Sequence, residues 1–137
     1  MNTTTHTAPM APMAPPTPMT RSARTVFVFG IYLAVLGIGL LVAPGPLLAP
    51  FGLPAPQEVW VRVGGMVIAF LGAYYMLAAK HGLRPFMAWT VATRASVIVV
   101  FGVLVATGLG PAVLLLFGVV DLAGAVWTWA ALRREAA

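Results

Sequence analysis

Four long apolar segments constrain the fold of this chain more than any other feature of its sequence. They cover residues 25–43, 58–79, 86–107 and 111–132. An α-helix needs about 20 apolar residues to cross the hydrocarbon core of a bilayer. Lipid offers no partner for backbone N–H and C=O groups, so each segment has to satisfy its own, as a helix does. The sequence therefore predicts an all-α membrane protein, an antiparallel bundle of four transmembrane helices.

The composition excludes several other classes of protein. The chain is 61% hydrophobic and only 8% charged, whereas soluble domains are about 25% charged. It has no cysteine, which excludes disulfides, iron–sulfur ligation and thiol catalysis. The net charge is +5, but the basic residues form no patch. We therefore expect the lipid bilayer as partner and no binding of nucleic acid.

The chain divides into a short tail and one membrane domain. Residues 1–20 are rich in Pro, Thr and Met and carry no charged side chain, which predicts a disordered tail. Residues 21–137 then form the transmembrane domain. Its first loop, residues 44–57, is rich in Pro and Gly and is expected to lie at the membrane interface.

The basic residues predict the orientation of the helices. They flank the first segment on its N-terminal side, join the second to the third, and follow the fourth: Arg21, Arg24, Lys80, Arg84, Arg133 and Arg134. With four spans, all of these positions fall on one side, which the positive-inside rule makes the cytoplasm. The sequence thus predicts an inner (plasma) membrane protein with both termini in the cytoplasm.

Two opposite charges interrupt the apolar segments. Arg94 lies about 13.5 Å into the third span and Asp121 about 15 Å into the fourth, at about 1.5 Å per residue, so both are near the middle of the membrane. The tight turn between these spans makes them neighbours, and a direct salt bridge is expected. It is either a structural bridge that fixes helix pairing, or a site for a proton, an ion or a polar ligand.

Three threonines accompany this pair. Thr90 and Thr93 precede Arg94 by one turn or less, and Thr128 shares a helical face with Asp121. Their hydroxyls are expected either to bind the two charges or to bond back to carbonyls of their own helix.

A second pair, Glu58 and Arg62, lies at the start of the second span. The spacing i, i+4 with Glu first favours an ion pair on a helix, and Arg62 can extend its charge to the outer interface. The pair is expected to set the position of the helix. The alternative is that Arg62 lines an outward-facing cavity.

Small residues recur at helical spacing in the first two spans: Gly30 and Ala34, then Gly65, Ala69 and Ala73. Such faces let helices approach closely in lipid. The contact is either within the chain or with a second copy or another membrane protein.

No catalytic group, cofactor site or metal site is expected. His6 and His81 both lie outside the spans, and no cluster of carboxylates and histidines is present, so haem ligation in the bundle and a di-metal site are excluded.

The stretches Trp60-Val-Arg62-Val-Gly64-Gly65, Trp89-Thr-Val-Ala-Thr-Arg94 and Phe117-Gly-Val-Val-Asp121-Leu-Ala-Gly124 carry a resemblance that covers about residues 24–134. In these positions the chain resembles the small four-helix bacterial membrane proteins described as DoxX-like. Some of those resemble subunits of quinone-linked oxidoreductases.

Three hypotheses of function follow. The first is a non-catalytic accessory or scaffold subunit in which Arg94 and Asp121 form an internal bridge. The second is a small oligomeric transporter or permeability protein with Asp121 as its titratable group. The third is a quinone-binding subunit of a membrane oxidoreductase, with the quinone between Tyr74, Trp127 and Trp129.

Overall fold

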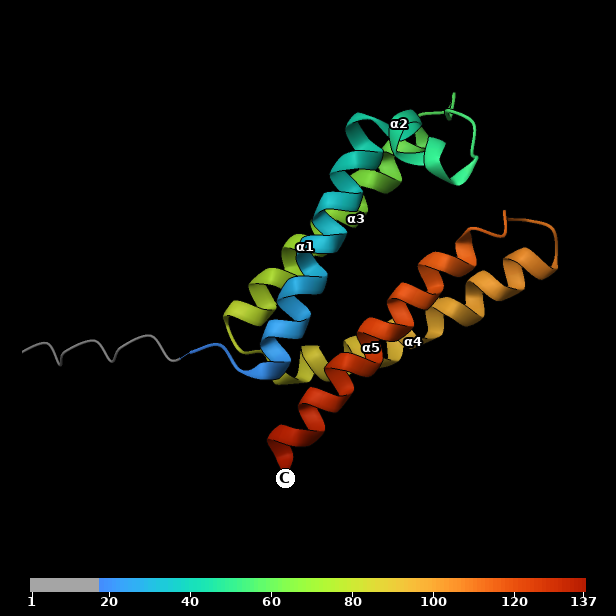
Figure 1. Ribbon diagram of the computed structural model, residues 1–137. Helices are drawn as coiled ribbons and strands as arrows, with labels where there is room; N and C mark the ends of the chain where they lie inside the picture. The colour runs from blue at the N-terminus through green and yellow to red at the C-terminus, as the bar shows by residue number, and fades with distance from the viewer. Residues whose placement is uncertain (1–17) are drawn as a thin grey trace, which may run out of the picture.

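The computed structural model describes residues 18–137, and within them the chain is helical without strands (Figure 1). Four helices are long and apolar enough to cross a membrane: α1 (Arg21–Val42), α3 (Trp60–Lys80), α4 (Arg84–Ala106) and α5 (Leu114–Ala136). The predicted four-helix membrane fold is therefore confirmed. The disordered tail predicted for residues 1–20 lies, up to residue 17, outside the described residues.

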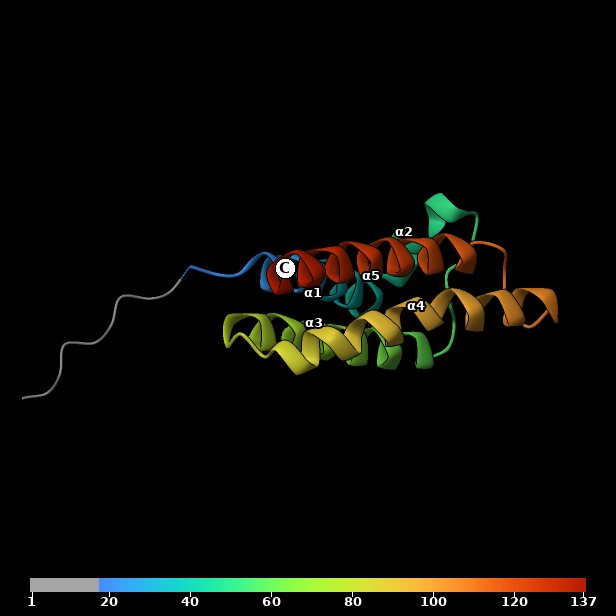
Figure 2. The same cartoon turned by 90° about the horizontal axis from the view of Figure 1, so that it is seen from below.

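The four long helices form two antiparallel hairpins. α1 packs along α3, α4 packs along α5, and the main contact between the hairpins is made by α1 and α5. Figure 2 shows α1 and α5 in one layer and α3 and α4 in the other. In Figure 1 the hairpins meet at the end where α1 begins and α5 ends, and they diverge toward the opposite end.

The helices begin and end within a few residues of the predicted bounds. α1 begins at Arg21, earlier than expected, because the Thr20 hydroxyl accepts a hydrogen bond from the Ala23 amide at 3.2 Å and caps the helix. At the other hairpin turn, Gly108 adopts a φ of 73°, and α5 then begins at Leu114, later than expected.

The first loop is more ordered than an irregular interfacial loop. It contains a short helix, α2 (Pro44–Leu48), and a 3₁₀ turn, η1 (Ala49–Phe51). A proline fits the first turn of a helix because its missing N–H has no partner there. The ring of Phe51 lies 5.5 Å from that of Phe117, so this segment leans toward α5 across the diverging ends of the hairpins.

Glycines bring α1 and α3 into close contact. A Cβ on Gly37 would collide with the Ala69 amide nitrogen, and one on Gly65 would lie 2.6 Å from that of Leu41. Gly72 meets Ala34 in the same way, at 2.6 Å. The small-residue faces of the first two spans thus pack against each other within one chain.

The apolar core lies where the hairpins meet. Its buried members come from α1, the end of α3 and the start of α4: Ala23, Val26, Phe29, Leu33, Tyr75, Ala79 and Met87. Away from this core the hairpins contact each other less, and cavities occupy the space between them.

Candidate functional site

Two cavities lie between the hairpins and share Leu33, Val97 and Asp121 in their walls. The first, of about 340 Å³, extends toward the diverging ends, where α2 and η1 contribute Leu47, Leu48 and Phe51. Apart from Tyr32, its other walls are apolar side chains, among them Leu36, Leu40, Phe101 and Phe117. The second, of about 360 Å³, is lined on α3 and α4 by Tyr75, Phe86, Trp89, Thr90, Thr93 and Arg94.

Asp121 lies on the wall of both cavities. It is partly buried and, among residues 18–137, is the only charged side chain that lines the first cavity. Within residues 18–137 its carboxylate receives no hydrogen bond and forms no salt bridge; the ion pair of these residues joins Arg84 and Glu135. A carboxylate with apolar neighbours and no donor is costly, so this group is set to accept a hydrogen bond.

Arg94 is anchored by other groups. Its side chain is 2% exposed, and its Nη2 donates to the Thr128 hydroxyl at 2.6 Å while its Nε donates to the Thr90 carbonyl at 3.3 Å. The guanidinium carbon lies 4.4 Å from the centre of the Phe29 ring. A cation over a desolvated ring contributes about 2 kcal/mol. Arg94 therefore joins α4 to α5 and α1.

The direct bridge expected between Arg94 and Asp121 is not formed at salt-bridge distance. The Cα–Cβ bonds of a helix tilt toward its N-terminus. In an antiparallel pair, side chains at the same depth thus lean in opposite directions. Arg94 leans toward the start of α4 and reaches Thr128, which lies about 10 Å along α5 from Asp121 at about 1.5 Å per residue.

Thr128 is the centre of a small buried network. Its side chain is fully buried, and its hydroxyl accepts from Arg94 and Thr25 and donates to the Gly124 carbonyl at 3.0 Å. Thr25 on α1 lies 2.9 Å away. The sequence placed Thr128 beside the charges but missed Thr25 and Phe29, because nothing in the pattern of α1 shows which helix it faces.

The other two threonines have a local role. The Thr90 hydroxyl donates to the Met87 carbonyl at 2.8 Å, and the Thr93 hydroxyl lies 3.3 Å from the carbonyls of both Trp89 and Thr90. Both therefore bond back to α4, one of the two expected outcomes. Both threonines line the second cavity beside Arg94, together with Phe86 and Trp89 of the same helix.

Gly124 lets the guanidinium of Arg94 lie against α5. A Cβ at this position would lie 3.0 Å from Arg94 Nη1 and 2.9 Å from Phe29 Cδ2. The same Nη1 is a buried donor without a hydrogen-bond partner in the described residues. The ring of Phe29 covers it in place of an oxygen.

The pair expected between Glu58 and Arg62 is not formed. α3 begins at Trp60, so Glu58 precedes the helix and the i, i+4 geometry does not apply. Arg62 Nη1 donates instead to the carbonyls of Leu41 and Val42, at 2.6 and 3.0 Å. These are among the last carbonyls of α1, which lack partners within their own helix, and a cation is favourable there. Arg62 lines neither cavity.

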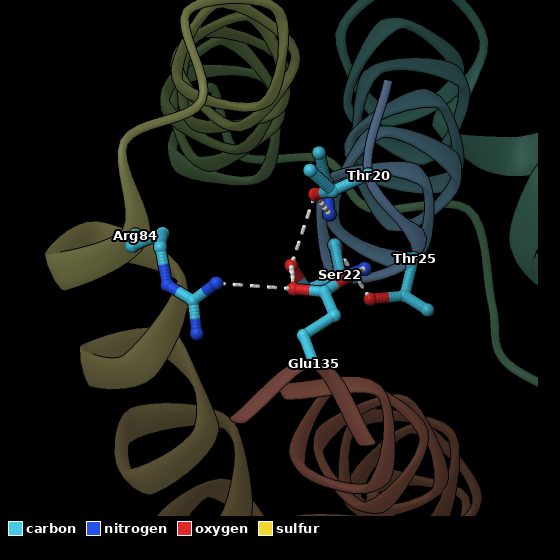
Figure 3. A network of polar contacts seen from close by, with 6 residues as sticks. Thr20, Ser22, Thr25, Arg84 and Glu135 are labelled. Atoms are coloured by element: carbon cyan, nitrogen blue, oxygen red, sulfur yellow. Dashed lines mark hydrogen bonds and ion pairs between the residues drawn. The ribbon is translucent and has the colours of Figure 1, made fainter. Parts of the chain in front are cut away.

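A further network, missed from the sequence, closes the end of the bundle where α1 begins and α5 ends. Glu135 accepts hydrogen bonds from the Ser22 amide and hydroxyl, both at 2.7 Å, and pairs with Arg84 at 3.5 Å. Figure 3 shows Glu135 reaching from α5 to α1 and α4. The sequence did offer a signal for this contact. The first turn of α1 contains no acidic residue, and Glu135 near the chain end is an acid that can take that place.

The aromatic residues of the quinone hypothesis are not brought together. Tyr74 is 61% exposed on α3, whereas Trp127 and Trp129 are 51% and 48% exposed on α5. None of the ring–ring contacts within residues 18–137 joins them. Within residues 18–137, no group of three or more His, Cys, Asp or Glu side chains comes together that could hold a metal ion.

Comparisons with known proteins give no match, so a function has to be inferred from the geometry of the cavities and their lining residues. No protein family, curated protein or solved structure matches this chain.

Proposed function

We propose that this small integral membrane protein is a non-catalytic protein that binds an amphipathic small molecule between its two hairpins, with Asp121 as the polar contact. The observation that carries the proposal is the position of Asp121 on the wall of two largely apolar cavities, where its carboxylate has no hydrogen-bond or salt-bridge donor within residues 18–137. Arg94, the neighbour that was expected to neutralise it, is held by Thr128 and Phe29.

The cavity walls define the chemistry of the ligand. A carboxylate favours a molecule with a hydroxyl or amine, because it only accepts hydrogen bonds when ionised. Apart from Tyr32, the remaining lining side chains are apolar and include Leu36, Phe101 and Phe117. A cavity of about 340 Å³ falls in the lower part of the range for small-molecule sites, about 300–1,000 Å³. The ligand class is therefore a short aliphatic or aromatic alcohol or amine.

The proposed setting is a bacterial inner membrane with the termini in the cytoplasm. Six basic residues lie where α1 and α4 begin and where α3 and α5 end: Arg21, Arg24, Lys80, Arg84, Arg133 and Arg134. The positive-inside rule supports this orientation. The first cavity then lies toward the outer face. The resemblance to DoxX-like proteins stays a prediction.

A small carrier or permeability protein is the second candidate. It is favoured because Asp121 lines both cavities, so a proton or an amine bound from one cavity has a route into the other. The accessory-subunit hypothesis is compatible with either role.

The test compares ligand binding by the protein and by Asp121→Asn. Native mass spectrometry of the purified full chain measures binding of decylamine, decanol and decanesulfonate. We expect the protein to prefer the amine and the alcohol, and Asp121→Asn to lose at least tenfold in affinity for the amine, because hydrogen bonds to charged groups contribute about 1.5–3 kcal/mol. Glu58→Gln, an exposed acid outside the cavities, is the control. Equal amine binding by Asp121→Asn contradicts the proposal.

The carrier hypothesis has its own measurement. In proteoliposomes with a pH gradient, Asp121→Asn should abolish amine-coupled proton flux. Unchanged flux in this variant would show that Asp121 is not the site that binds the transported proton or amine.

A further inference from the structure

A third cavity lies at the opposite end of the bundle from α2, between the start of α1 and the end of α5. Its volume is about 340 Å³, and it is lined by Arg21, Arg24, Thr25, Trp127, Ala130, Ala131 and Arg134. No acidic side chain of the part of the chain that the structure describes lines it. We call these residues the arginine groove. It is separate from the cavities beside Asp121 and shares no lining residue with them.

The charges of the groove are available to a ligand. Arg21, Arg24 and Arg134 are exposed, and none of them forms a salt bridge within residues 18–137. The nearest acid along the chain, Glu135, is occupied by Ser22 and Arg84 (Figure 3). Three arginines thus line one concave surface, and within residues 18–137 none of them forms a salt bridge.

Arg133 provides a contrast on the same helix end. Its guanidinium carbon lies 4.9 Å from the centre of the Trp129 ring, and it does not line the groove. Arg133 and Arg134 are therefore adjacent basic residues that differ in whether they face this surface.

The position of the arginine groove and the types of residue that line it favour an anionic phospholipid as its ligand. Each arginine of the groove lies in a terminal turn of a membrane-spanning helix, where phospholipid head groups lie beside the protein. A guanidinium binds two phosphate oxygens in its fork geometry, and tryptophan favours the head-group level. Basic pockets between transmembrane helices are typical sites for head groups that carry several phosphates.

We propose that the arginine groove binds the phosphate groups of an anionic phospholipid, with Trp127 against the glycerol and the upper acyl chains. The three arginines favour a head group with two phosphates, so diphosphatidylglycerol binds more tightly than phosphatidylglycerol, and phosphatidylcholine binds least. The site does not depend on the ligand proposed for the Asp121 cavities.

Native mass spectrometry tests this site on the full chain in detergent, with each of the three lipids added separately. We expect the affinity order just given. Arg134→Gln should lower the affinity for diphosphatidylglycerol about fivefold, the size expected for one basic residue at an anionic membrane surface. Arg24→Gln with Arg134→Gln should lower it about 25-fold by the same rule.

Matched controls decide between a site and general attraction of charge. Arg133→Gln removes the same charge outside the groove and should leave the affinity within twofold of the unmodified protein. An equal loss in Arg133→Gln and Arg134→Gln overturns the proposal, as does equal binding of the three lipids. Displacement of diphosphatidylglycerol by millimolar inorganic phosphate also overturns it, because the site then recognises free phosphate. If the double variant does not fold, Arg134→Gln alone carries the test.

Discussion

At the residue scale, the two charges that interrupt the spans have different roles. Arg94 is buried and tied to Thr128, Thr90 and the ring of Phe29. An arginine in the middle of a transmembrane helix costs about 2.5–3.5 kcal/mol on insertion scales, and these contacts offset much of that cost. Asp121 has no such contacts among the described residues and faces the cavities. These surroundings support the proposal of a structural role for Arg94 and a ligand-binding role for Asp121.

Replacing Thr128 tests the structural role of this network. Thr128→Val keeps the size of the side chain but removes the acceptor for Arg94 Nη2 and Thr25. A buried charged donor is then left unpaired, and we expect the free energy of unfolding to fall by about 1–3 kcal/mol. Ordinary hydrogen bonds between membrane helices contribute only about 0.6 kcal/mol. The free energy of unfolding is measured in bicelles.

Thr107→Val is the matched control for this prediction. The Thr107 hydroxyl is exposed and bonds only to the carbonyls of Val103 and Leu104 on its own helix. Its loss should change the stability by less than about 0.6 kcal/mol. Equal effects of the two substitutions would show that the Thr128 network does not stabilise the protein.

The sequence predicted which helices carry these residues, but not all of their partners. Arg94 lies on α4, and Asp121 and Thr128 lie on the neighbouring α5. Their depth in the membrane stays a prediction from the rise along a helix. The expected contact between Arg94 and Asp121 does not form because the side chains of a helix lean toward its N-terminus. This lean moves the guanidinium of Arg94 by about one turn toward the start of α4. Thr25 and Phe29 come from α1, and no local pattern shows how a distant helix is rotated.

At the element scale, the sequence predicted each long helix but not all of its ends. Apolar length identifies a span, whereas its first residue depends on capping; Thr20 adds a polar turn to α1. The same limit applies to Glu58, whose expected pairing required α3 to begin before Trp60. The small-residue faces of α1 and α3 were predicted from the sequence. That they contact each other, and not a second copy or another protein, was not.

Two adjacent glycines of α3 test how that contact stabilises the hairpin. A Cβ on Gly65 would lie 2.6 Å from the Leu41 amide nitrogen and 2.7 Å from the Gly37 carbonyl oxygen, whereas a Cβ on Gly64 meets nothing within 4 Å. Gly65→Ala should therefore push the helix backbones apart and destabilise the protein by about 1–3 kcal/mol. Thermal unfolding in detergent gives the comparison.

Gly64→Ala serves as the control because it makes the same chemical change one residue away. Alanine favours a helix by about 1 kcal/mol over glycine, so this variant should be as stable as the unmodified protein or more stable. A Gly65→Ala variant of equal stability would contradict the close packing of α1 on α3.

At the scale of the whole molecule, the fold joins two hairpins at one end and leaves cavities toward the other. The joined end holds both the polar contacts of Glu135 with Ser22 and Arg84 and the apolar core around Val26 and Met87. The sequence predicted four antiparallel helices, but not this asymmetry. The asymmetry depends on which helices of the two hairpins contact each other. The main contact between the hairpins joins α1 to α5, the first and last helices of the bundle.

The proposed orientation in the membrane can be tested with single cysteines, because the chain has none of its own. Gln57→Cys and Leu109→Cys place a thiol in the turns at the diverging end, and His81→Cys places one in the turn at the joined end. All three positions are exposed. With the basic residues in the cytoplasm, a membrane-impermeant maleimide should label Gln57→Cys and Leu109→Cys in intact spheroplasts, and His81→Cys only after lysis. Labelling of His81→Cys in intact spheroplasts would reverse the orientation, and different labelling of the two outer positions would contradict the antiparallel fold.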